Sequence, residues 1–435
     1  MARRLFFGLA LLVTGGLIAF AEEEGKNQVY VDLNILGRGE MRFGGFTEGA
    51  EENRAQFLME RTRLSVGYNR PYIEAKVTAQ HSGIWGQSNK GSFNLYEAWA
   101  RLYTKNGLFA KMGRQVLSYD DERIIGANDW AMAANSHDVL KLGYEGYGHK
   151  VHAILGFNQN AENLTGGTYY AGDSYKIMHT LWYHYDVPKM PLGVSLLFMN
   201  IGMEGGRKND NGDFTVEPHN IYQQLIGGYI SYNPKKLMLE ASYYHQLGRN
   251  ENNVKIDAWM ASVKAQYQIT RQVGAVAGYD YLSGDHYEYV REPGTFGLVQ
   301  HRVFSGFQSV YGSHHKFYGM MDFFYVQTVK DTFSPGLQNL YAGATYSPIK
   351  ELNLKATYHY LAMATNLRYV GKTLGHDIDF EASYQILKDA RCSLGFSYMT
   401  GSKAMEDLKC VEADSNLKWA WFSLVVSPRI VTKKW

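Results

Sequence analysis

Apolar and polar residues alternate along most of the chain, in segments of about ten residues or more, the length of a membrane-crossing strand. One face of the segment 259–269 carries Trp259, Ala261, Val263, Ala265, Tyr267 and Ile269. The other face carries Met260, Ser262, Lys264, Gln266 and Gln268. The same period of two recurs at 31–42, 352–360 and 377–386. This pattern predicts β-strands with one apolar and one polar face along the whole chain.

A soluble β-sandwich would alternate in the same way, with its apolar face forming a core. Here the apolar faces end in tyrosine and tryptophan, as they do where strands cross the membrane interfaces. The composition agrees, because Tyr 33, Phe 21 and Trp 8 stand beside only Pro 9. Alternation also accounts for the mean hydropathy of -0.32. We therefore predict an all-β fold, a single transmembrane antiparallel β-barrel with a polar interior.

Short and long connections alternate between the predicted strands. Short turns are expected at 69–71, 105–107, 146–148, 187–191, 233–235, 270–271, 347–348 and 388–389. Longer polar stretches are expected at 44–53, 86–91, 118–137, 158–173, 204–218, 249–254, 285–336, 364–373 and 402–416. These connections predict about 18 strands, with short periplasmic turns, long extracellular loops and both termini on the periplasmic side. The count treats 285–336 as one long loop that folds back into the lumen, although His315 to Gln327 could also be a strand.

The first residues have the pattern of a secretory signal peptide. Arg3 and Arg4 precede an apolar run, and Ala19-Phe20-Ala21 supplies small residues for cleavage. We expect residues 1–21 to be removed and 22–435 to form one barrel domain. A retained membrane anchor is the alternative, but the run is shorter than the roughly 20 apolar residues of a spanning helix.

Charge is balanced, since 44 lysines and arginines face 42 acids over the whole chain. The balance lacks the basic footprint of a nucleic-acid-binding protein, so we expect no nucleic-acid partner. Any electrostatic function depends on where the charges lie. The two cysteines, Cys392 and Cys410, are expected some 25 Å apart at about 3.3 Å per strand residue, too far for a disulfide.

The strand register directs many charged side chains toward the predicted lumen. The expected pore-lining residues on these strands are Arg38, Arg42, Arg61, Arg63, Arg101, Lys111, Lys141, Asp377 and Asp379. Arg114 follows Met112 on the outward register, so it needs a bulge or a strand end to turn inward. Such cations would attract an anionic solute. The alternative is that they pair with Glu40, Glu60 and Glu97 and only brace the wall.

Catalysis and metal binding have little support in the sequence. His314-His315 with Asp322 lies within one long loop, and no nucleophile motif accompanies it. We expect no catalytic residue, no metal and no cofactor. A plug-sized domain before the first strand is lacking, which disfavours an energy-coupled transporter.

Three groups of residues resemble the signatures of the alginate export family of outer-membrane barrels. The first comprises Gly113-Arg114-Gln115, Tyr119, Arg123, Gly126, Asp129-Trp130 and Asp138. The second comprises Tyr311-Gly312, His315, Phe317, Gly319 and Asp322, and the third is Gly375 to Asp379. The chain departs from the family at His137, where an aromatic residue is more usual, and at Asp377, where the family has glutamate.

The resemblance implies a barrel in the bacterial outer membrane whose cationic constriction, including Arg114 and Arg123, conducts an anionic uronate polymer outward. The expected partners are outer-membrane lipid, an anionic saccharide or small acidic solute, and the assembly machinery that would recognise the terminal strand and Trp435. Two alternatives stay open. One is a general diffusion porin for small acidic solutes, and the other is a structural or adhesive barrel without transport.

Overall fold

The computed structural model describes residues 27–44, 54–87, 91–159, 175–208, 214–249, 254–291, 297–324, 333–366, 371–409 and 416–435. The predicted signal peptide and Cys410 lie outside these ranges, so the structure tests neither the cleavage nor the absence of a disulfide. Cys392 has no disulfide partner within the described ranges. Within the same ranges, no helix is long and apolar enough to cross a bilayer.

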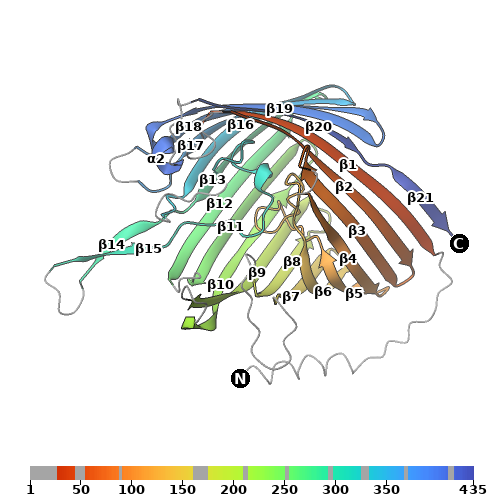
Figure 1. Cartoon of the computed structure of the whole chain (residues 1–435), viewed down its shortest axis with the longest axis horizontal. Coiled ribbons are helices and arrows are strands. Elements are labelled where there is room, and N and C mark those ends of the chain that lie inside the picture. Colours follow the sequence, from red (N-terminus) through yellow and green to blue (C-terminus); the bar gives the residue numbers. More distant parts are fainter. Residues whose placement is uncertain are drawn as a thin grey trace.

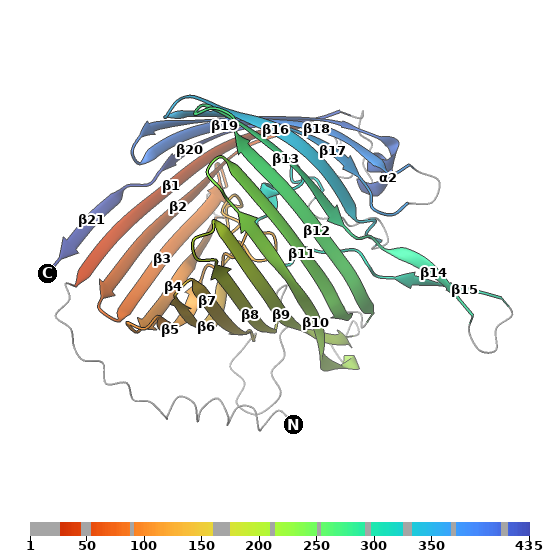
Figure 2. The ribbon, with the colours of Figure 1, turned by 180° about the vertical axis from the view of Figure 1, so that it is seen from behind.

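Antiparallel strands form one closed barrel (Figures 1 and 2). The first six are β1 (Gln28–Phe43), β2 (Arg54–Arg70), β3 (Ile73–Ile84), β4 (Ser92–Tyr103), β5 (Leu108–Gln115) and β6 (His137–Gly146). The next seven are β7 (His149–Phe157), β8 (Ile177–Asp186), β9 (Leu192–Lys208), β10 (Phe214–Tyr232), β11 (Leu237–Arg249), β12 (Lys255–Gln268) and β13 (Val273–Leu282). The barrel is completed by β16 (Leu337–Ile349), β17 (Leu352–Ala362), β18 (Thr373–Leu387), β19 (Ala390–Gly401), β20 (Asn416–Val426) and β21 (Arg429–Lys434).

The first and last strands close the barrel. β1 pairs with β2 on one side and with both β20 and β21 on the other, so these last two strands share one position. The sheet of 19 strands therefore has eighteen positions around the lumen, which confirms the predicted strand number. Pro428 separates β20 from β21, and its carbonyl accepts a hydrogen bond from the Leu33 N–H at 3.0 Å.

The predicted alternation of short turns and long connections is confirmed, but the predicted loop 204–218 is largely strand, because β9 extends to Lys208 and β10 begins at Phe214. Short turns join successive strands at one end of the barrel, as between β2 and β3, β6 and β7, or β18 and β19. One turn is shifted from its predicted place, because β16 continues through Pro348 to Ile349 and the turn falls at Lys350 and Glu351. A register shift between Tyr346 and Ile349 accommodates the proline, which cannot donate to the ladder.

The outer face is apolar and ends in aromatic residues, as a membrane-facing wall requires. Tyrosines face outward near the short-turn end of the strands at Tyr144, Tyr185, Tyr232, Tyr267, Tyr346 and Tyr384. A second aromatic group lies toward the other end at Tyr243, Trp259, Tyr281, Tyr358 and Tyr398. Between the two groups the outward residues are mostly aliphatic, such as Leu196, Val263 and Leu394.

The segment between β13 and β16 is more varied than the single loop expected from the sequence. It contains a separate two-stranded hairpin, β14 (His286–Val290) and β15 (Val299–Val303), which projects away from the barrel in both views (Figures 1 and 2). It also contains a short 3-10 turn at His314–Lys316, which lies inside the barrel in Figure 1.

One α-helix, α2 (Lys403–Lys409), follows β19 and packs against β18 and β19.

Gly113 offers a direct test of how closely β4 and β5 approach. Its φ of 117° is unfavourable for other residues, and a Cβ there would lie 2.2 Å from the carbonyl oxygen of Ala98. We expect Gly113→Ala to destabilise the barrel by about 1–3 kcal/mol, the usual size of such local strain. The measurement is urea unfolding followed by the heat-dependent gel mobility of the barrel. Gly37→Ala is the control, because a Cβ at Gly37 would have no neighbour within 4 Å. Equal stability of the two variants would contradict this account of Gly113.

Candidate functional site in the barrel lumen

Two segments fold into the lumen and divide it. We call residues 116–136 the first inner loop and residues 304–324 the second inner loop. Arg61 on the wall donates to the carbonyl oxygen of Asp129 at 2.9 Å, and Arg38 donates to that of Trp130 at 2.8 Å. The N–H of Met320 donates to Asp379 of β18 at 2.9 Å. Both inner loops are therefore fastened to inward-facing side chains of the barrel.

The two inner loops are also joined to each other. Ile125 and Tyr311 form a parallel β-bridge. Beside it, Glu122 accepts a hydrogen bond from the Ser313 hydroxyl at 2.5 Å and pairs with Lys316 at 2.8 Å. Burial raises the pKa of Glu122, but hydrogen bonds from Lys316 and serine hydroxyls outweigh it, so the pKa lies below its ordinary value of 4.5. We call Glu122, Ser313 and Lys316 the loop clamp.

A buried charge network lies beneath this junction. Arg123 is 5% exposed and pairs with Asp280 of β13 at 3.0 Å and with Asp121 at 3.2 Å. Arg123 also donates to the Tyr318 hydroxyl at 2.9 Å and lies over the Phe317 ring at 4.1 Å. Burial lowers the pKa of Arg123, but the attraction of Asp280, Tyr318 and Asp121 holds it well above its usual value. Arg123 thus binds the two inner loops to each other and to the wall.

An apolar cluster seals one side of the inner loops. Leu117, Ile124 and Phe307 pack against inward-facing wall residues such as Met199 and Met260. The alternation placed Met260 among polar residues on the predicted lumen face, whereas it is fully buried beneath the inner loops. Apolar residues on the inward register, among them Met178, Met199, Ile201 and Met260, were the signal in the sequence that something covers this wall.

Three of the predicted pore-lining arginines act as attachments for the first inner loop. Arg61 and Arg63 both pair with Asp129, at 3.2 Å and 2.7 Å. Arg38 lies over the Trp130 ring at 3.9 Å and pairs with Glu40 at 3.0 Å. These side chains face inward as expected, and their guanidinium groups are engaged. Their contacts therefore agree with the alternative in which the inward arginines pair with acids and stabilise the structure.

Arg42 also pairs with Glu40, at 2.8 Å, although its side chain is 42% exposed. Asp377 and Asp379 face inward from β18 but pair with none of the predicted arginines in the described part of the chain. Asp379 accepts from Met320 and from the Ser397 hydroxyl. Asp377 lies against Gly319, where a Cβ would be 2.5 Å from its carboxylate. Asp379 therefore holds the second inner loop, and Asp377 lies beside it.

The structure corrects the expectation that Arg114 turns into the pore. Arg114 pairs in register with Ala98 and Asp138, and Ala98 pairs with Val77, which is 48% exposed on the outer wall. Paired residues share a face of the sheet, so Arg114 faces outward. It forms a two-point ion pair with Asp138 at 2.9 and 2.7 Å. The positive φ of Gly113 bends the chain without reversing the direction of Arg114.

Three other predicted cations form a continuous row on the lumen wall. Arg101, Lys111 and Lys141 are directly opposite one another on β4, β5 and β6. Arg101 pairs with Glu74 at 3.1 Å. Among the described residues, Lys111 and Lys141 have no ion pair, and Lys111 lies over the Trp99 ring at 3.6 Å. We call Arg101, Lys111 and Lys141 the cation row.

A polar cavity of about 560 Å³ lies elsewhere in the lumen, below the joined inner loops. Wall residues from β1, β18, β19 and β20 line it together with Trp130, His315 and Lys316. Trp130 stacks on His315 with ring centroids 3.7 Å apart. Arg391 adds an exposed guanidinium that has no ion pair within the described ranges. The cavity is lined by hydroxyl and amide groups and by charged groups of both signs, including Glu122, Asp129 and Glu381, which suit a polar solute.

His315 and Asp322, the pair considered from the sequence as a metal or catalytic centre, lie together in the second inner loop. His315 and Asp322 form a hydrogen bond of 3.1 Å within the second inner loop, and His315 is stacked on Trp130. In the part of the chain that the structure describes, no three histidine, cysteine or acidic side chains are grouped as metal ligands. The histidine and the aspartate therefore serve the packing of the loop.

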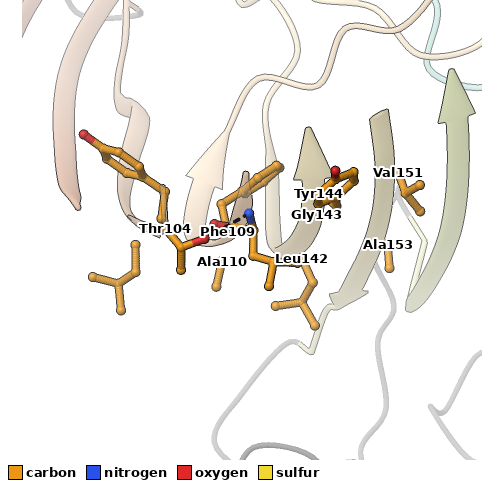
Figure 3. Close-up of a pocket in the computed structure, with 11 residues that line it drawn as sticks. Thr104, Phe109, Ala110, Leu142, Gly143, Tyr144, Val151 and Ala153 are labelled. Carbon is orange, nitrogen blue, oxygen red and sulfur yellow. Dashed lines mark hydrogen bonds between the residues drawn. The ribbon is translucent and has the colours of Figure 1, made fainter. Parts of the chain in front are cut away.

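A further hollow, on the outer wall, is apolar and lies near the short turns of β4 to β7. Figure 3 shows Ala110, Leu142, Val151 and Ala153 among the residues that line it. Leu142 and Val151 belong to the outward register, with exposed fractions of 36% each. Such a surface suits contact with lipid acyl chains, so this hollow is separate from the lumen site.

A closed barrel with an apolar outer wall, inward loops and a charged lumen defines the class of outer-membrane porins. The chain matches the family model for alginate export over residues 27–399, and it belongs to that family. It is accordingly a protein of the bacterial outer membrane. The short turns are then on the periplasmic side and the long connections on the extracellular side. No curated protein matches the sequence.

Solved structures with the same fold include three channels of Pseudomonas aeruginosa. OccK9 (OpdG) superposes with a TM-score of 0.59 at 12% identity, covering 92% of this chain and 98% of that one. OccK3 (OpdO) gives 0.60 at 10% identity, with 93% and 96% covered. OccK2 (OpdF), solved in complex with glucuronate, gives 0.58 at 10% identity, with 93% and 98% covered. At these identities the likeness concerns the fold.

The charge network of Arg123 can be tested by removing the arginine. Arg123→Met would leave Asp280 and Asp121 buried without their counter-charge, a change that typically costs about 3–5 kcal/mol. We expect the variant to unfold at lower urea concentration and to give a larger, noisier single-channel current, because the inner loops lose their attachment. Arg42→Met is the matched control, since a half-exposed pair contributes only about 0–1 kcal/mol. Equal effects of the two substitutions would show that Arg123 does not hold the inner loops.

The loop clamp should depend on pH. Because the pKa of Glu122 is lowered in the folded protein, its contribution is present above the ordinary pKa and is lost as the pH falls through the lower, folded value. We expect channel noise to rise as the pH falls below 4.5, the ordinary pKa of this carboxyl group, and Glu122→Gln to show the same noise at neutral pH. Single-channel recording between pH 7 and pH 3 measures both. Glu351→Gln, at a short turn, should retain the wild-type pH dependence, and a Glu122→Gln channel with that dependence would exclude the clamp as its origin.

Proposed function

We propose that the barrel conducts small acidic solutes of the uronic acid type across the outer membrane. The observation that carries the proposal is the cation row. Like charges directly opposite on adjacent strands destabilise a sheet, so three cations in register need a reason beyond the fold. An anion passing along the wall supplies the missing counter-charge.

The partial burial and the contacts of the cation row favour passage of an anion over its tight binding. Arg101, Lys111 and Lys141 are only partly buried, so water still solvates them. Lys111 is held on the Trp99 ring by a cation–π contact, which fixes its position without cancelling its charge. A row of such groups raises the local concentration of anions, and several weak sites in series allow a solute to leave as well as enter.

The comparisons support an acidic saccharide as the solute class. The family is named for the export of alginate, and OccK2 was solved with glucuronate bound. Each of these ligands belongs to another protein, and both combine hydroxyl groups with carboxylates. The lumen offers hydroxyl and amide groups in the cavity and uncompensated cations in the row, which matches that combination. The proposal assigns no catalytic step to the chain.

The proposal includes the expected processing and partners. Residues 1–21 would be removed on secretion, and residues 22–435 would form the mature barrel. Its outer wall would contact outer-membrane lipid, and the terminal strand ending at Trp435 would be recognised by the assembly machinery. Periplasmic and extracellular solute concentrations would set the direction of flow, since diffusion through a pore has no direction of its own.

Ion selectivity tests the proposal. In planar bilayers with a salt gradient, we expect the wild-type reversal potential to indicate anion preference. Lys111→Gln/Lys141→Gln should shift it toward the value for a non-selective pore, because the uncompensated charges are removed. Sodium glucuronate should reduce the chloride current more than glucose does at equal concentration.

The control keeps the same change of charge away from the lumen. Lys350 and Lys189 lie on short turns, and Lys350 is 90% exposed, so Lys350→Gln/Lys189→Gln should leave the reversal potential unchanged. Cation selectivity of the wild type would refute the proposal. Absence of conductance from a correctly folded barrel would favour the structural alternative.

A further inference from the structure

The barrel wall has a notch on its extracellular side between β4 and β6. β5 pairs with β4 only from Ala98 to Tyr103, although β4 begins at Ser92. The chain leaves the wall after Gln115, forms the first inner loop and returns at His137. The segment 92–97 of β4 therefore has no β5 neighbour. We call the space bounded by this segment and by Gln115 and His137 the rim notch.

A cavity of about 500 Å³ occupies the rim notch. Asn94 and Tyr96 line it from β4, Asn135 lines it from the end of the first inner loop, and His137 lines it from the start of β6. Tyr175 and Tyr311, the latter of the second inner loop, also line it. The cavity is thus built by several separate parts of the chain, all within the described residues, and it is distinct from the cavity below the inner loops.

Two polar atoms in this cavity have no hydrogen-bond partner among the described residues. They are Oδ1 of Asn94 and Nε2 of His137, and both atoms are buried. His137 is 7% exposed, and its other ring nitrogen, Nδ1, is 3.3 Å from the Tyr175 hydroxyl. A buried polar atom without a partner typically costs about 1–3 kcal/mol. Two of them in one cavity indicate a ligand that brings hydrogen-bonding groups of its own.

Charge in the rim notch is already balanced. The Arg114 guanidinium makes its two-point ion pair with Asp138 and donates a third hydrogen bond to the carbonyl oxygen of Leu95 at 3.2 Å. This pinned arginine closes the floor of the cavity and leaves no net positive charge there. The ligand is therefore recognised by hydrogen bonding and not by a negative charge.

Aromatic rings complete the lining. Tyr311 meets Tyr175 edge to face at 5.6 Å and meets His137 in the same way at 5.4 Å. Such a fixed set of rings offers an apolar surface next to the unpartnered amide oxygen and ring nitrogen. A saccharide has matching faces, because its C–H groups are apolar and its hydroxyls both donate and accept hydrogen bonds.

We propose that the rim notch is an extracellular binding site for one sugar unit of a saccharide, recognised through its hydroxyl groups and independent of carboxylate charge. A sugar hydroxyl donates to Asn94 Oδ1, and another pairs with His137 Nε2, as donor or acceptor according to the histidine tautomer. The proposal rests on the saccharide transport proposed above, to which it adds a contact point at the outer mouth.

Saturation-transfer NMR on the full-length protein in detergent micelles tests the site, with glucose and sodium glucuronate as separate probes. In Lys111→Gln/Lys141→Gln, which lacks the two lysines of the cation row, we expect both sugars to bind with dissociation constants within about twofold of each other. Asn94→Leu and His137→Phe should each weaken binding about tenfold, as the loss of one buried hydrogen bond implies. Heat-dependent gel mobility verifies that each variant is folded.

Asn34→Leu is the matched control, because Oδ1 of Asn34 is also buried without a partner but lines the cavity below the inner loops. This variant should keep rim binding of glucose, as should Lys111→Gln/Lys141→Gln. Unchanged glucose binding in both folded rim variants would overturn the site and assign its unpartnered atoms to water. A strong preference for glucuronate that persists in Lys111→Gln/Lys141→Gln would also overturn it, because recognition at the rim would then depend on the carboxylate. Rim binding in a barrel without anion selectivity would uphold the site and refute the proposed function.

Discussion

Every other feature of this barrel depends on the pairing of backbone N–H and C=O groups within the membrane. Hydrocarbon offers no partner for these groups, so a strand there must have a neighbour on both sides. β1 meets this requirement by pairing with β2 and with β20 and β21. Closure then fixes the period of two, with aliphatic side chains outside and charged ones inside. The wall departs from full pairing at residues 92–97 of β4, and there Arg114 donates to the free carbonyl of Leu95.

Closure of so many strands creates a lumen that wall side chains alone do not fill. The two inner loops occupy this space, and their own polar backbone must then be satisfied away from bulk water. Arg38 and Arg61 provide donors for loop carbonyls, and Asp379 accepts from a loop N–H. The wall charges closest to the inner loops are therefore structural, and the apolar cluster on the opposite side holds the loops by burial.

Much of the fold follows from the sequence because strand alternation and short turns are local signals. Those turns also fix the cross-strand register, which is why Arg101, Lys111 and Lys141 could be placed on one face from the sequence. The inner loops could not be foreseen in the same way, because their contacts are remote: Arg61 meets Asp129 across 68 residues, and Arg123 meets Tyr318 across 195. Alternation also does not distinguish inward positions that face water from those that a loop covers, so it predicted that Met260 faces a polar lumen. The strand alternation already gave Arg114 an outward direction. Its partner Asp138 could not be foreseen, because the whole first inner loop separates the two residues in the sequence.

Burial separates the inward cations into two groups with different physical roles. A guanidinium that is 5% exposed, such as Arg123, has lost most of its water and is tolerable only with Asp280, Asp121 and Tyr318 around it. Lys111 and Lys141 retain part of their hydration, so the fold can leave them without carboxylate partners. Their positive charge then acts on whatever enters the lumen. Because an arginine that is already paired has little attraction left for a solute, the number of inward cations is a poor guide to selectivity. The unpaired, partly exposed ones set it, and among the described wall residues they include Lys111 on β5, Lys141 on β6 and Arg391 on β19.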